Sequence, residues 1–103
     1  MKIIEKLADK ISEEIRDATR YAKLAVKYRA DYPEVAKTLY DLSTEEMDHM
    51  GRLHTAVAGL IDQYRATNGD PPAAMQAVYD YLHKQQMIAA NKARSIQAMY
   101  KDA

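Results

Sequence analysis

The sequence predicts an all-α protein, in which an antiparallel helical hairpin is followed by a third helix. Three observations lead to this prediction. Apolar residues recur at helical steps of three and four along most of the 103 residues, strong helix breakers cluster at two places, and no stretch alternates between apolar and polar residues as a half-buried strand does. A chain of this length can bury one modest core, so we expect a single helical domain over residues 1–103.

The first helix is expected over residues 3–30. Its apolar positions follow one line along the helix, and a single carboxylate, that of Glu14, stands on this line. Burying a carboxylate without a partner is costly, so Glu14 requires an explanation. The residues on the line are Ile4, Leu7, Ile11, Glu14, Ala18, Tyr21, Ala25 and Tyr28.

The second helix is expected over residues 34–67. Asp31 can cap its start, Pro33 fits the first turn, and Glu34 has the spacing of a capping box. A carboxylate and an imidazole, those of Glu46 and His49, interrupt its apolar line. That line comprises Val35, Leu39, Leu42, Glu46, His49, Leu53, Ala56 and Leu60.

The third helix is expected over residues 71–101. Asn68 and Gly69 suit the end of the preceding helix, Asp70 suits a new N-cap, and Pro71 suits the first helical position. This helix contains no glutamate. Its apolar line runs through Met75, Val78, Leu82, Gln85, Ala89, Ala93, Ile96 and Met99, with Tyr79, Ala90 and Tyr100 widening it.

Composition and charge argue against several classes of protein. The chain has 15 acidic and 15 basic residues, so no overall charge favours nucleic acid or an anionic membrane. It has no cysteine and therefore no disulfide or thiolate metal site. No apolar run is long enough to span a bilayer, and the charged first residues lack the apolar core of a secretory signal. We expect a cytoplasmic protein without nucleic-acid or membrane partners.

The register of the hairpin brings the three polar interruptions together. A short connection makes the first two helices antiparallel neighbours, so positions equally far from the turn lie at the same height. Glu14 and His49 are symmetric about the junction of residues 31 and 32, and Glu46 is one turn away. We therefore expect them to converge in the core. They form either a hydrogen-bonded polar cluster that fixes helix register or a site for iron, manganese or zinc.

One hairpin supplies only half of a dinuclear site. Two copies would supply four glutamates and two histidines, which is the ligand set of di-iron and di-manganese carboxylate bundles. The third helix has no glutamate to complete that set within one chain. We therefore predict a homodimer, or a higher homo-oligomer, in which two hairpins form a four-helix bundle around the metal ions.

The remaining histidines do not follow this pattern. His54 lies well around the helix from His49, and His83 follows Asp80 in an Asp-x-x-His spacing that misses the main apolar line. We interpret His54 and His83 as surface or interface residues rather than metal ligands.

The hairpin resembles the ferritin-like superfamily, particularly one half of a bacterioferritin or rubrerythrin subunit. The resemblance rests on the segments EIRDATRY at residues 14–21 and EEMDH at residues 45–49, and it covers roughly residues 3–65. It implies that Glu14 and His49 are terminal ligands and that Glu46 bridges two metal ions. It also implies supporting roles for Glu45, as an acidic residue behind the ligands, and for Tyr21, as a hydrogen-bonding tyrosine near the site.

The chain departs from the family pattern because a second hairpin with its own Glu and Glu-x-x-His is missing. The nearest precedent is a half-length ferritin-like protein that builds its site across a dimer, as encapsulated ferritins do. The resemblance implies a dinuclear iron or manganese site with ferroxidase or peroxide-scavenging activity. A second hypothesis is a non-catalytic helical interaction or accessory protein in which the Glu/His cluster is structural.

Overall fold

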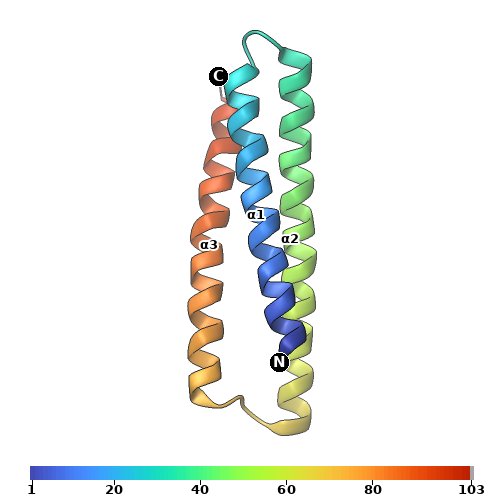
Figure 1. Ribbon diagram of the computed structural model, residues 1–103, viewed down its shortest axis with the longest axis vertical. Coiled ribbons are helices and arrows are strands. Elements are labelled where there is room, and N and C mark those ends of the chain that lie inside the picture. The colour runs from blue at the N-terminus through green and yellow to red at the C-terminus, as the bar shows by residue number, and fades with distance from the viewer. Residues whose placement is uncertain (103) are drawn as a thin grey trace.

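Three long helices form an elongated bundle in the computed structural model, which describes residues 1–102. They are α1 (Lys2–Tyr28), α2 (Pro33–Asn68) and α3 (Ala73–Lys101), and residues 1–102 contain no strand. The bundle measures 56 × 18 × 17 Å, and α1 lies between α2 and α3 and packs along both (Figure 1). The predicted all-α class and the antiparallel hairpin are confirmed.

The connection between α1 and α2 is a tight turn whose cap differs from the prediction. Pro33 is the first residue of α2, and Tyr32, not Asp31, is the N-cap, without a side-chain capping bond. The ring of a proline disfavours helical backbone in the residue before it, which explains why α2 starts at Pro33 itself. The N–H of Tyr32 donates to the carbonyl of Tyr28 at 2.8 Å and so closes the end of α1.

At the connection between α2 and α3, α2 ends as predicted, but α3 begins later than predicted. Gly69 has a φ of 76°, which side chains rarely allow, and its N–H donates to the carbonyl of Arg65 at 2.9 Å. α3 begins at Ala73 with Pro72 as its N-cap, so the predicted cap at Asp70 is wrong. Both Asp70 and Pro71 precede a proline and are therefore held away from helical backbone.

The buried side of α1 matches the predicted line and extends beyond it. Every residue of that line is buried or half-buried, including Glu14. Ile15 and Ala22 are buried as well, because α1 has a neighbour on each side. Ile11 and Ile15 form a core cluster with Met50 of α2 and Ala90 of α3.

The predicted apolar line of α2 lies at the edge of the buried surface, whereas that of α3 coincides with it in part, at Ala90 and Ala93. The fully or nearly buried residues are Ala36, Ser43 and Met50 in α2 and Gln86, Ala90 and Ala93 in α3. Larger residues of the predicted lines are exposed, including Val35, Val78, Leu82 and Met99. Small side chains at the contact let α2 and α3 approach α1 closely. Both helices are therefore rotated about their axes so that these small residues face α1.

Buried hydrogen bonds fix how the three helices fit together. The hydroxyl of Ser43 in α2, which is fully buried, donates to the carbonyl of Ala18 in α1 at 2.6 Å. The same oxygen accepts a hydrogen bond from Gln97 in α3 at 2.8 Å. Gln86 in α3 donates to the carbonyl of Ala8 in α1 at 3.0 Å. These polar groups are paired, so burying them specifies register at little cost.

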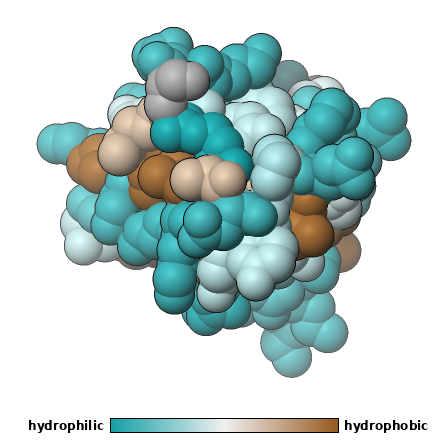
Figure 2. Space-filling model, turned by 90° about the horizontal axis from the view of Figure 1, so that it is seen from above, coloured by the Kyte–Doolittle hydropathy of each residue, from teal (hydrophilic) through white to brown (hydrophobic). Residues whose placement is uncertain are grey.

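The surface of the bundle carries apolar residues on its flanks. In the view from above, hydrophobic groups reach the surface on two separate sides of this end, between mostly hydrophilic groups (Figure 2). Over residues 1–102, no helix combines the length and apolar composition needed to cross a membrane.

Candidate metal centre

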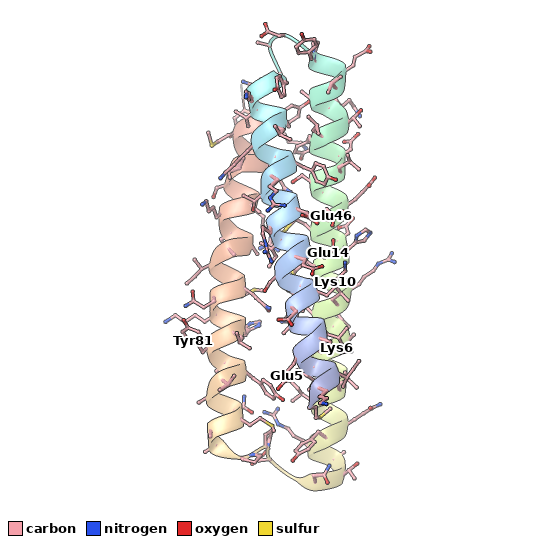
Figure 3. The ribbon with its side chains drawn as sticks, viewed as in Figure 1. Glu5, Lys6, Lys10, Glu14, Glu46 and Tyr81 are labelled. Carbon is pink, nitrogen blue, oxygen red and sulfur yellow. The ribbon has the colours of Figure 1, made fainter. Side chains whose placement is uncertain are left out.

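Glu14 of α1 and Glu46 and His49 of α2 meet at one point near the middle of the hairpin. We refer to these three residues as the Glu/His cluster. Each offers one ligand atom, and the three atoms lie within 4.8 Å of one another. Figure 3 shows Glu14 and Glu46 facing each other across the space between α1 and α2. The predicted pairing of Glu14 with His49 across the turn is confirmed, since both lie at the same height.

The two distances from His49 to the carboxylates suit a shared metal ion. Nδ1 of His49 lies 3.5 Å from Oε2 of Glu14 and 3.8 Å from Oε2 of Glu46. Two atoms bound to the same ion at about 2.1 Å each lie at most about 4.2 Å apart. Both measured distances fall below that limit, and both exceed the separation of a hydrogen-bonded pair. Two carboxylates with one imidazole are a donor set for iron, manganese or zinc.

Glu14 supplies the strongest sign that the cluster is built to hold a cation. Oε2 of Glu14 is buried and has no hydrogen-bond partner among the described residues. Buried polar atoms are nearly always paired, and an unpaired carboxylate oxygen is especially costly. This oxygen is the atom that faces His49. A divalent ion between the two would satisfy it, so the residues present fit the metal that the ligand pattern implies.

Lys10, which the sequence analysis did not single out, supplies one positive charge to the cluster. Its Nζ lies 3.3 Å from Oε2 of Glu13 and 3.4 Å from Oε1 of Glu14 (Figure 3). Hydrogen bonds to Glu13 and Glu14 raise the pKa of Lys10 above its ordinary value of 10.5, so the side chain stays charged at neutral pH. The spacing of four residues between Lys10 and Glu14 could have indicated this contact.

The cluster lies at an open edge of the hairpin, not in the closed core that we predicted. The side chain of His49 is 55% exposed, whereas those of Glu46 and Glu14 are 20% and 9% exposed. α3 lies on the other side of α1, because Gln86 reaches Ser12, and residues two apart on a helix point in nearly opposite directions. One hairpin therefore covers only part of the cluster.

The two residues expected to support the ligands are in different surroundings. Glu45 is exposed on α2, beside Glu46 in sequence. Tyr21 is half-buried on α1, about 10 Å along the helix from Glu14. The hydrogen bonds of residues 1–102 include none from either side chain to the cluster, so their supporting roles stay predictions.

His54 of α2 and His83 of α3 contact each other across the bundle. Nε2 of His54 lies 3.0 Å from Nδ1 of His83, and the ring centres are 4.8 Å apart. An interface or surface position was expected for each histidine, but the contact between them was not. α2 and α3 are joined by a connection of only four residues, so counting from it could have placed the two histidines at similar heights. The contact also depends on how both helices are rotated about their axes, which became visible only with the fold.

Comparison with known proteins identifies the family of the chain. The model of the rubrerythrin family matches residues 5–102, which is nearly the whole chain. Neither the curated proteins nor the solved structures gave a significant match. The family match agrees with the resemblance seen at residues 14–21 and 45–49, and it extends through α3. The chain belongs to the rubrerythrin family, a ferritin-like di-iron family.

Proposed function

We propose that two copies of this chain join through the open side of the hairpin and hold a dinuclear metal site between them. Iron is the expected metal, with manganese and zinc as alternatives, and the expected activity is oxidation of Fe(II) or removal of peroxide. The observation that carries this proposal is the buried, unpaired Oε2 of Glu14, facing a histidine and a second carboxylate. A closed structural cluster would pair that oxygen with a hydrogen-bond donor.

The open side of the hairpin suits a second copy of the same surface. Ile3 and Val35, which are 49% and 54% exposed, lie on the same sides of α1 and α2 as Glu14 and His49. Half-buried apolar residues continue this strip, namely Leu7, Tyr21, Leu42, Leu53 and Leu60. A two-fold dimer buries the same patch on both copies, so two half-sites would meet to give four glutamates and two histidines.

The chain's own residues prepare the site for a cation. Glu14 and Glu46 supply negative charge at a partly buried point, and His49 supplies a neutral nitrogen donor. Lys10 neutralises part of that charge when no metal is bound, and its half-exposed side chain can move into solvent as a divalent ion enters. Iron ions, when bound, supply one-electron redox chemistry, in which Fe(II) is oxidised while oxygen or peroxide is reduced.

Fe(II) oxidation should be faster with the protein than in buffer. The test mixes anaerobic protein and Fe(II) with oxygen or with hydrogen peroxide and follows Fe(III) by absorbance. We expect the wild type to accelerate the reaction and His49→Ala to return it to the rate in buffer. The matched control is Asp48→Asn, a change at the neighbouring exposed position, which should keep the wild-type rate.

Two results would contradict the proposed activity. A wild-type rate equal to that in buffer would remove the oxidase function. An equal loss in Asp48→Asn and His49→Ala would mean that surface charge, rather than the Glu/His cluster, handles the iron. Either result would favour a helical interaction protein with a structural cluster.

A further inference from the structure

We propose that His54 and His83 form a second metal site, separate from the Glu/His cluster, which binds one late divalent transition ion such as Cu(II), Ni(II) or Zn(II). The site joins α2 to α3, whereas the Glu/His cluster joins α1 to α2. This second site is independent of the function proposed above, because the two sites share no residue.

The separation of the two imidazoles is the separation of two ligands on one ion. Nε2 of His54 and Nδ1 of His83 are 3.0 Å apart. Two nitrogens that bind one ion at about 2.0–2.1 Å lie about 3 Å apart when the angle between them is near 90°, and somewhat further apart in a tetrahedron. The two nitrogens are therefore already at the separation of two ligands on one ion, and binding requires the rings to turn so that both lone pairs point at it.

Asp80 could supply an oxygen ligand to the pair. Asp80 precedes His83 by three residues, which places both side chains on the same face of α3. Asp80, His54 and His83 line one cavity of about 160 Å³. Oδ1 of Asp80 now accepts a hydrogen bond from Gln76 at 2.9 Å. A change of its side-chain rotamer would direct the carboxylate toward the imidazoles, and water would complete the coordination.

The composition of this second site favours a different metal from the first. Two imidazoles with one carboxylate form a nitrogen-rich set, and imidazole suits copper, nickel and zinc. The Glu/His cluster is oxygen-rich. Beside Gln76, Tyr79 and Gln86, the rest of the cavity is lined by apolar side chains, including those of Ile4, Ile11 and Ile61. They limit the access of water to one side of the site and so strengthen the binding of a cation to its ligands.

Metal titration of variants tests the site. Zn(II) binding is measured by calorimetry on the full chain carrying His49→Ala, so that the Glu/His cluster does not contribute. We expect one Zn(II) per chain and a loss of affinity on the order of 10²-fold in His54→Gln, since two linked ligands bind far more tightly than one. His83→Gln should lose as much, and the double variant should bind Zn(II) more weakly than either single variant.

A spectroscopic measurement identifies the ligands. Cu(II) bound to the His49→Ala protein should show electron paramagnetic resonance splitting from two imidazole nitrogens, and His54→Gln or His83→Gln should remove that pattern. Thermal melts with chelator check that these variants fold, as expected because His83 is exposed and His54 is only half-buried. Equal Zn(II) affinity in His49→Ala with and without His83→Gln would overturn the proposal. So would two-nitrogen splitting that survives either Gln change.

The outcome is independent of the first site. If wild-type protein binds Zn(II) only through residues that His49→Ala removes, the second site is absent and the proposed function stands. If the His49→Ala protein binds Zn(II) and loses it with His54→Gln, the second site stands whether or not iron is oxidised.

Discussion

Replacing His49 by Ala is expected to abolish stoichiometric binding of Mn(II) and Fe(II) at the Glu/His cluster. His49 provides the single nitrogen donor, and its Nδ1 is within 4 Å of both carboxylates. Loss of a group that merely orients a ligand weakens metal binding about 10- to 100-fold, so loss of a ligand should weaken it by at least about 100-fold. Glu46→Ala should have an equal effect. Elemental analysis and calorimetry with Mn(II) measure both.

The matched control for these variants is Glu13→Ala. Glu13 is exposed, lies one position from Glu14, and contacts Lys10 at 3.3 Å. Glu13→Ala removes one negative charge near the Glu/His cluster without changing a residue of the cluster, so Mn(II) affinity should change little. A loss as large as that in His49→Ala would contradict the assignment of Glu14 as the ligand of α1.

Replacing Glu14 and Glu46 together by Gln is expected to stabilise the protein in chelator and to remove its response to metal. The unpaired Oε2 of Glu14 is a buried negative oxygen, and an amide at this position could donate an N–H instead. We expect unfolding to cost about 1–3 kcal/mol more. The melting temperature should rise by about 4–8 °C for each kcal/mol.

Added Mn(II) should reverse the order of stability. An ion that binds only the folded state stabilises it by about 2.7 kcal/mol at a concentration 100-fold above its dissociation constant. Wild-type protein should therefore melt higher with Mn(II), and the double variant should not respond. Glu5→Gln combined with Asp62→Asn, two exposed changes on α1 and α2, is the control for the loss of two negative charges. A double variant that melts lower than wild type, together with a wild type insensitive to Mn(II), would indicate a structural Glu/His cluster.

The helices and their connections could be predicted because local chemistry decides them. Pro33, Gly69 and Pro71 act through backbone restrictions that hold in any context, and the long periodic segments between them form helices. The errors at Asp31 and Asp70 have the same origin. A proline also restricts the residue before it, and in both places this effect excluded the expected cap.

The rotation of α2 and α3 could not be predicted from single helices. The apolar lines chosen for them followed the largest side chains, such as those of Val35 and Leu82, which are exposed. Apart from Met50, the buried positions are small or polar, such as Ala36 and Ser43. Small residues let the helices approach α1 closely, and Ser43 has a hydrogen-bond partner on α1. These are properties of the assembled bundle.

The candidate site was largely predictable because residues equally far from the turn of an antiparallel hairpin lie at the same height along the helices. Counting from the turn paired Glu14 with His49, and helical spacing added Glu46. The exposure of His49 was not predictable, because it follows from the position of α3 on the far side of α1. The contact between His54 and His83 was also missed, since it depends on how α3 returns along α2.

Native mass spectrometry of the chain loaded with Fe(II) without oxygen, or with Mn(II), tests the central claim most directly. It measures the number of chains and the number of metal ions in the same particle. We predict a dimer, or a multiple of it, that carries two ions per pair of chains and loses both when His49→Ala is introduced. A monomer that binds one ion, or a dimer without bound metal, would contradict a dinuclear site built from two hairpins.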